Sequence, residues 1–284
     1  MTELRHITAG GLRQHYFECG PADGPPIVLV HGFPLDHTMW REQFAALGER
    51  HRVIAPDLRG FGRTDVKPGV VTMERFADDI AALLDAILGS GGGSGGGAGG
   101  GSKTRPVTFC GLSMGGYIAW QFWRRHRTRL AKLILCDTRA VADQEEVARG
   151  RLQMAERVSR DGAGFVPDAM LGRLFAPSTR EQRPDLLDDI RSVILRTAPE
   201  GIAAGQRGMA ARPDVTGWLS EIDVPTLVVC GKHDLISPPG EMRAIAASIP
   251  DARYVEIPGA GHMAPLEAPA LVNAALLRFL DVSR

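Results

Sequence analysis

Short apolar runs, each closed by turn-forming residues, recur along the chain. They span residues 26–32, 51–57, 106–111, 131–137, 225–231 and 252–259. None alternates apolar with polar positions, as a strand with one face in water would do. Continuous apolar runs of this length are typical of strands buried on both faces, so the pattern predicts a parallel sheet inside the protein.

Helical patterns lie between several of these predicted strands. Residues 72–88 carry apolar side chains at helical spacing, with Thr72 in a position to cap the first turn. Residues 113–126 and 269–280 also predict helices. The alternation of strands and helices indicates the α/β class, with a mostly parallel central sheet flanked by helices. Two earlier segments, "LRHITA" and "LRQHYFEC", are expected to add antiparallel strands at one edge.

The strand pattern stops between residues 138 and 216. Amphipathic helical patterns occupy residues 143–162 and 183–197 instead. This region predicts a helical cap, or lid, inserted after the sixth strand. We therefore expect residues 1–137 and 217–284 to form one core domain, with residues 138–216 as the cap.

A glycine-rich run, "GSGGGSGGGAGGGS", occupies residues 89–102. It resembles an interdomain linker, but both of its flanks belong to the same alternation of helix and strand. We therefore interpret it as a flexible loop insertion within the core domain. The overlapping "GAGGGSKT" is not a phosphate-binding loop, because Ser102 replaces the required glycine and the run follows a helix rather than a strand.

Composition narrows the possible partners. The chain has 284 residues, with 33 Lys and Arg against 33 Asp and Glu. This balance argues against a nucleic acid or an anionic membrane as the partner. No secretory signal pattern or long apolar run is present, so a cytoplasmic protein is expected. The four cysteines fit no zinc spacing and are expected as buried free thiols: Cys19, Cys110, Cys136 and Cys230.

The strongest chemical signal is "CGLSMGGY". Residues 111–115 match G-x-S-x-G between a predicted strand and a predicted helix. In that context the motif forms a sharp turn that exposes a nucleophilic serine at the carboxyl end of the sheet. Ser113 is therefore the predicted nucleophile.

A serine nucleophile needs a base and an orienting acid. His262 follows the last predicted strand, and Asp234 follows the strand before it, so both loops lie at the same edge as Ser113. The chain order Ser113, Asp234, His262 is the one expected for a nucleophile elbow. Asp137, at the end of another strand, is a second candidate for the acid. His31 is expected to have a structural role.

The backbone N–H groups of Met114 and Phe33 are the expected donors to the oxyanion of the reaction. One apolar residue of the loop after the third predicted strand and several apolar residues of the cap are candidates for the substrate pocket. They are Trp40, Met154, Phe165, Met170, Leu174 and Phe175. Nothing in these motifs calls for a metal or an organic cofactor.

Five motifs together resemble the α/β-hydrolase fold superfamily. They are "HGFP", "PDLRGFGRTD", "GLSMGG", "GKHDLISPP" and "GAGHMAPLE", in the expected order. The sequence "GLSMGGYIAW" and a helical lid resemble esterases and lactonases of the 3-oxoadipate enol-lactonase type. Serine at the elbow differs from the aspartate of epoxide hydrolases and haloalkane dehalogenases.

The resemblance implies a serine hydrolase that cleaves a small to medium carboxylic ester or lactone through an acyl-enzyme. Two alternatives use the same triad, namely C–C bond hydrolysis and cofactor-free perhydrolysis. A third is a non-catalytic ligand receptor. The sequence does not indicate the oligomeric state.

Overall fold

A computed structural model describes residues 3–67, 69–89 and 105–281. Apart from Gly89, the predicted loop insertion at 89–102 lies outside the described residues. The near match to a phosphate-binding loop, residues 97–104, lies entirely outside them as well. The interpretation of this run as a flexible loop therefore stays a prediction.

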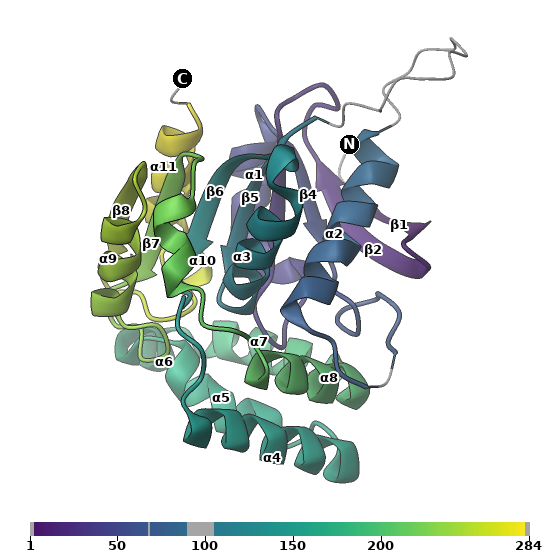
Figure 1. Cartoon of the computed structure of the whole chain (residues 1–284). Helices are drawn as coiled ribbons and strands as arrows, with labels where there is room; N and C mark the ends of the chain where they lie inside the picture. Colours follow the sequence, from purple (N-terminus) through teal and green to yellow (C-terminus); the bar gives the residue numbers. More distant parts are fainter. Residues whose placement is uncertain (1–2, 68, 90–104, 282–284) are drawn as a thin grey trace.

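The centre of the molecule is an eight-stranded sheet with the order β1-β2-β4-β3-β5-β6-β7-β8 (Figure 1). At one edge, β1 (Glu3–Ala9) and β2 (Leu12–Cys19) form an antiparallel hairpin, and β2 also pairs antiparallel with β4. The remaining pairs are parallel. These strands are β3 (Pro26–Val30), β4 (Arg52–Pro56), β5 (Val107–Leu112), β6 (Leu130–Cys136), β7 (Thr226–Gly231) and β8 (Ala252–Ile257). The predicted mostly parallel sheet is thus confirmed.

Helices flank the sheet, as the sequence pattern predicts. α2 (Met73–Leu88) packs beside α3 (Met114–His126), and α1 (Arg41–Gly48) packs beside α11 (Pro269–Leu280). α9 (Pro239–Ser248) covers β7 and β8, and the short α10 (Ala264–Glu267) precedes α11. The Thr72 hydroxyl oxygen accepts a hydrogen bond from Arg75 N at 3.2 Å, which confirms the expected cap of α2.

Five helices fill the chain between β6 and β7, and we call them the helical segment. They are α4 (Glu145–Asp161), α5 (Val166–Leu174), α6 (Pro177–Gln182), α7 (Pro184–Arg196) and α8 (Pro199–Ala210). Figure 1 shows them beyond the carboxyl ends of the parallel strands. The sequence pattern predicts α4 and α7 but not the glycine-rich α8, whose Gly201 and Gly208 approach the backbone of Gly60 and Val71.

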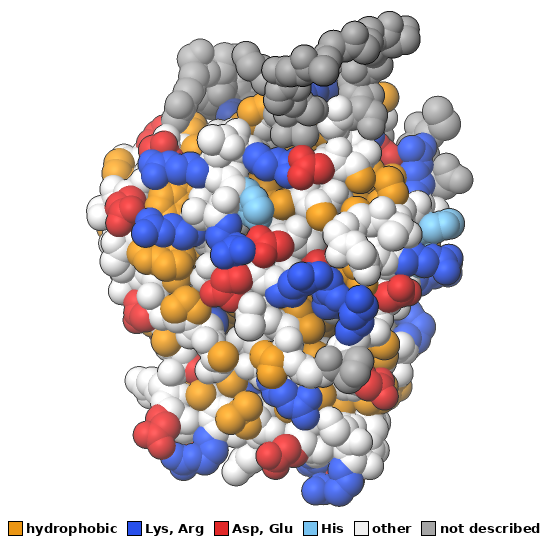
Figure 2. Space-filling view, turned by 45° about the vertical axis from the view of Figure 1, so that its right-hand side comes forward, with side chains coloured by type: hydrophobic (Ala, Val, Ile, Leu, Met, Phe, Trp, Pro, Cys, Tyr) orange, Lys and Arg blue, Asp and Glu red, His pale blue; other side chains and the backbone are white. Residues whose placement is uncertain are grey.

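The central strands are buried on both faces, which explains their continuous apolar sequences. All four cysteines are buried and free, as expected. Within the described residues, no helix has both the length and the hydrophobicity that a membrane span requires. On the face in Figure 2, acidic and basic side chains stand beside one another, in keeping with the balanced charge.

Candidate active site

Ser113 lies in the turn between β5 and α3. Its backbone has φ of 54° and ψ of −111°, a left-handed conformation that is strained for a residue with a side chain. The surrounding chain holds it there. Ser113 N donates to Cys136 O at 3.0 Å, and the Thr138 hydroxyl donates to Ser113 O at 2.8 Å. This turn has the backbone geometry of a nucleophile elbow.

Glycine is required on both sides of Ser113. A Cβ atom on Gly111 would overlap the carbonyl group of Gly115, and one on Gly115 would overlap the carbonyl oxygen of Val30. Because these obstacles are backbone atoms, a side chain at either position would force the strand and helix apart. The two glycines therefore allow β3, β5 and α3 to meet at Ser113.

His262 and Asp234 form a buried pair at the same edge of the sheet. His262 Nδ1 donates to Asp234 Oδ2 at 2.8 Å. The backbone N–H groups of Ile236 and Ser237 donate to Asp234 Oδ1 at 2.7 and 3.0 Å. Burial alone would raise the pKa of Asp234, but the charge and hydrogen bond of His262 and these two N–H groups lower it. Asp234 is therefore an ionised acceptor, and Nε2 of His262 stays free to accept a proton.

Asp137, the second candidate for the acid, has a different hydrogen-bond partner. Asp137 is fully buried and its Oδ1 accepts a hydrogen bond from Gly231 N at 2.7 Å. Of the two acid candidates, Asp234 is therefore the one that hydrogen-bonds to His262. His233, next to Asp234, is exposed, and its backbone N–H donates to Ala260 O at 2.8 Å.

Phe33, in the loop after β3, and Met114, the first residue of α3, carry the expected N–H donors. Within the described part of the chain, the N–H groups of Phe33 and Met114 donate to no other residue. His31 fixes this loop: its Nε2 accepts from Leu58 N at 3.0 Å and its Nδ1 donates to Gly32 O at 2.9 Å. Burial lowers the pKa of His31, so the ring stays neutral in this structural role.

Ser113 and His262 open into a common cavity of about 400 Å³. Three of the predicted pocket residues, Met154, Met170 and Leu174, line it together with Phe33. The other three do not, which corrects the prediction. Trp40, Phe165 and Phe175 are absent from the cavity lining.

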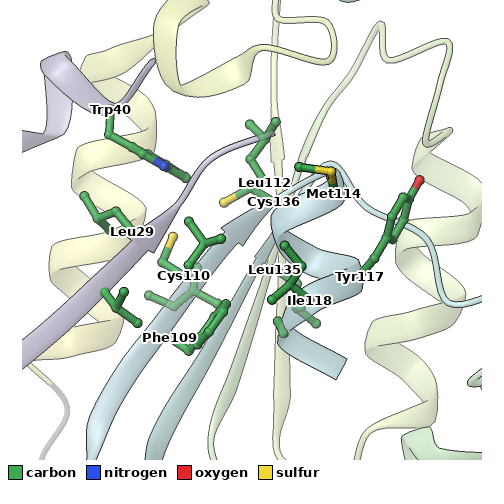
Figure 3. Close-up of a cluster of buried hydrophobic side chains, with 14 of the residues drawn as sticks. Leu29, Trp40, Phe109, Cys110, Leu112, Met114, Tyr117, Ile118, Leu135 and Cys136 are labelled. Carbon is green, nitrogen blue, oxygen red and sulfur yellow. The ribbon is translucent and has the colours of Figure 1, made fainter. Parts of the chain in front are cut away.

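Each of these three has another packing role. Trp40 is fully buried in the core with Leu29 and Leu112 (Figure 3). Phe165 is covered by the Arg157 guanidinium, 3.6 Å from the ring centroid, and Phe175 is buried in the core. The sequence therefore identifies these residues as apolar, but it does not show whether their side chains face the cavity or the core.

A sequence profile of the alpha/beta hydrolase family matches residues 27–275. The chain belongs to the alpha/beta hydrolase family. Among solved structures it is similar to a malate-bound thermophilic esterase from Thermogutta terrifontis, with 44% identity, a TM-score of 0.89 and 98% of each chain covered.

Lactonases are also among the relatives of this hydrolase. An enol-lactonase from Burkholderia xenovorans LB400 has 31% identity and a TM-score of 0.87, over 98% of this chain and 100% of that chain. A 3-oxoadipate enol-lactonase 2 from Acinetobacter baylyi is 24% identical over 270 residues, covering 95% of this chain and 94% of the relative.

The cavity of this hydrolase also has a polar wall that sequence reasoning missed. It includes Tyr117, Arg139, Asp143, Arg151, Arg173 and Gln206. Asp143 Oδ2 lies between Arg151 Nε at 2.6 Å and Arg212 Nη1 at 2.7 Å. Glu241 binds Arg139 through two hydrogen bonds of 2.8 Å.

Positive charge therefore exceeds negative charge on this wall. One carboxylate, Asp143, faces two guanidinium groups, and Arg173 has no ion pair with any described residue. Arg139 and Arg212 lie outside the helices, and Arg151 and Arg173 lie in two different helices, so no local sequence pattern marks them as neighbours at one cavity.

Glu267 connects the loop of His262 with the helical segment of the hydrolase. Its Oε1 accepts from Gly261 N at 2.8 Å and Met263 N at 3.2 Å. Its Oε2 accepts from Ala176 N at 2.8 Å and the Thr179 hydroxyl at 2.7 Å. Burial raises the pKa of Glu267 despite these donors. In the sequence, Glu267 stands close to His262 in "GHMAPLE", but nothing there indicates its hydrogen bonds to Ala176 and Thr179.

Among the residues that the structure describes, one group of side chains has the spacing of possible metal ligands. Asp137, Cys230 and Asp234 each place a possible ligand atom within 4.8 Å of the others. Burial raises the pKa of Asp137 and of Cys230, so both favour the protonated form, which binds cations poorly. Asp234 is already used by His262, and the group is thus unsuited to a cation.

Proposed function

We propose that the protein hydrolyses small to medium carboxylic esters or lactones through an acyl-enzyme, with Ser113 as nucleophile, His262 as base and Asp234 as orienting acid. One observation carries the proposal. The strained turn of Ser113 and the buried His262–Asp234 pair open into the same cavity. Esterases and enol-lactonases among the relatives support the same reaction type.

In the first half of the proposed reaction, Ser113 Oγ attacks the carbonyl carbon and its proton passes to His262 Nε2. The negative charge that forms on the carbonyl oxygen is stabilised by the N–H groups of Phe33 and Met114. The C–O bond to the alcohol then breaks, and His262 returns the proton to the leaving oxygen. The acyl group remains on Ser113.

In the second half, water attacks the acyl carbon and gives its proton to His262. The bond to Ser113 Oγ breaks, the serine recovers the proton and the carboxylic acid leaves. Throughout, the carboxylate of Asp234 holds Nδ1–H at 2.8 Å, which keeps Nε2 as the reactive nitrogen. For a lactone, both products remain one molecule.

The cavity and the charges around it support a more specific substrate. We propose that the helical segment (within residues 138–216) serves as a cap over the core formed by 1–137 and 217–284. Apolar residues from that cap and a volume of about 400 Å³ suit a small acyl or lactone group. The excess positive charge on the polar wall suits a carboxylate on the substrate, as in the 3-oxoadipate named for one relative.

Release of nitrophenol from nitrophenyl acetate tests the nucleophile. Ser113→Ala should lower kcat by at least about 10⁴-fold, because it removes the hydroxyl group that the proposed acyl-enzyme requires. Ser220→Ala, an exposed serine remote from the cavity, is the matched control and should keep wild-type activity. Equal rates for Ser113→Ala and wild type would contradict the proposal. An inactive wild type would favour C–C bond hydrolysis or a receptor role.

A further inference from the structure

Asp137 is a buried carboxyl group for which the proposed reaction has no use. It follows β6 and is fully buried. Its φ of 47° is positive, as is that of Ser113. The fold holds its backbone on both sides. Asp137 N donates to Val229 O at 2.9 Å, and the Ser237 hydroxyl donates to Asp137 O at 3.0 Å. Such a well-anchored polar group points to a role at the site.

The side chain of Asp137 is only half satisfied. Oδ1 accepts the bond from Gly231 N, whereas Oδ2 is buried and has no donor among the described residues. An oxygen of the Asp137 carboxyl group lies within 4.8 Å of a carboxylate oxygen of Asp234. A buried carboxylate oxygen without a donor is costly, but a carboxylic acid could use the same oxygen to donate.

Two adjacent buried carboxyl groups cannot both be ionised without strong repulsion, so one keeps a proton. Asp234 accepts three hydrogen bonds, from His262 Nδ1 and two backbone N–H groups, all of which stabilise its charge. Asp137 accepts one side-chain bond. The other titratable groups around Asp137 are the thiols of Cys136 and Cys230, with His262 beyond Asp234. The proton therefore belongs on Asp137.

We propose that Asp137 is a positioning residue which stays protonated and donates a hydrogen bond from Oδ2 to the Asp234 carboxylate. This assignment of its role rests on the proposed function of the Asp234–His262 pair. With this bond, Asp234 receives a fourth donor, in addition to His262 Nδ1 and the N–H groups of Ile236 and Ser237. A carboxylic acid adds a donor there without adding a second negative charge near the base.

The electrostatics agree with this geometry. Burial, followed by the negative charge of Asp234, raises the pKa of Asp137 well above its ordinary value. The pKa of Asp234 is lowered instead, as described above. The two carboxyl groups thus separate into one acid and one carboxylate.

Asparagine reproduces the proposed state of Asp137, because its amide accepts through oxygen, donates through nitrogen and carries no charge. Asp137→Asn should lower kcat by no more than about threefold, with the acid limb of the pH–rate profile unmoved. Asp137→Leu removes the donor and should lower kcat by about tenfold or more with little change in KM. A shift of the limb to lower pH in Asp137→Asn would overturn the proposal, because it would reveal the loss of a negative charge. Full activity of Asp137→Leu would overturn it as well.

Thermal unfolding tests the proton without relying on activity or on the leucine variant. A carboxyl group that is protonated when folded and ionised when unfolded costs stability increasingly as pH rises above its unfolded pKa of about 3.9. The Tm of Asp137→Asn relative to wild type should therefore rise from pH 5 to pH 8. A difference that is constant or falls over this range would refute the protonated state.

Asp57 is the matched control. It is also a buried aspartate beyond a parallel strand, but it accepts from His37 N at 3.0 Å, His37 Nδ1 at 2.7 Å and Arg63 N at 2.9 Å. Burial opposes its ionisation, yet these bonds lower the pKa of Asp57. Asp57→Asn should lower Tm at pH 7, unlike Asp137→Asn. If Ser113→Ala proved fully active, the proposed function would fail while these Tm measurements still located the proton.

Discussion

Aspartate occurs just beyond the carboxyl ends of β4, β6 and β7, and its surroundings differ each time. Asp57 is an ionised structural anchor for His37. Asp234 is an ionised partner of His262, and Asp137 has its pKa raised by burial and by Asp234. The sequence shows that each of these residues is an aspartate, but the protonation state of its carboxyl group depends on hydrogen-bond donors from distant segments. This is why the sequence alone left Asp137 and Asp234 as alternative acids.

Arg173 is a second residue whose role depends on its surroundings. Its guanidinium group lies on the cavity wall and has no ion pair within the described part of the chain. An ester with a carboxylate at the end remote from the scissile bond should gain from it. Arg173→Gln should lower kcat/KM for such a half-ester by about three- to tenfold and leave the corresponding neutral diester unaffected. Initial rates on both substrates at low salt measure the effect.

The control for Arg173 removes the same charge from the surface of a neighbouring helix. Arg180 of α6 is exposed and does not line the cavity, so Arg180→Gln should leave the preference unchanged. Equal losses in both variants would indicate general steering by net charge. Equal losses on both substrates for Arg173→Gln would contradict a contact with the carboxylate.

Among the elements, the strands and the elbow are the most predictable. Buried strands such as β5 need apolar residues throughout, and the turn at Ser113 needs glycine at 111 and 115. Both requirements fix residue types over a short stretch, so they can be recognised in the sequence. α8 leaves no such mark because its glycines serve close packing against Gly60 and Val71, contrary to helix propensity.

Alanine at Gly115 tests the close approach at the elbow. The added Cβ would meet the Val30 carbonyl oxygen, a backbone atom that cannot rotate away. Gly115→Ala should therefore lower the free energy of unfolding by about 3 kcal/mol or more. Chemical denaturation followed by circular dichroism measures the change.

Gly172 in α5 provides the comparison for Gly115. A Cβ atom there would meet nothing within 4 Å, so Gly172→Ala should be neutral or slightly stabilising through its better helix propensity. If Gly115→Ala were as stable as Gly172→Ala, the elbow would have room that the structure does not contain.

At the scale of the whole molecule, the chain order of strands and helices was sufficient to predict the sheet and its antiparallel edge. The helical segment was less predictable in detail, since its apolar residues divide between the core and the cavity. Met154 lines the cavity whereas Phe165 lies under Arg157. The packing of the segment against the core decides which side chains face the cavity. That packing depends on distant parts of the chain, so no short stretch of sequence predicts it.

The glycine-rich run connects two elements of the core, and its removal can be tested. α2 ends at Leu88 and β5 begins at Val107, and both are integral to the core. Replacing residues 91–101 by a short turn should keep kcat/KM within about twofold and should not lower Tm, because a shorter loop costs less closure entropy. Loss of activity in a folded variant would show that this run takes part in the function.

Glu267 has a consequence for how substrate reaches Ser113. One carboxylate binds Ala176 and Thr179 of the helical segment and also Gly261 and Met263 on either side of His262. A rigid-body movement of the segment away from the core would therefore break hydrogen bonds that flank His262. We therefore expect substrate to enter the cavity without such a movement of the segment. Hydrolysis should then follow simple saturation in solution, with no jump in rate where an insoluble ester begins to form droplets.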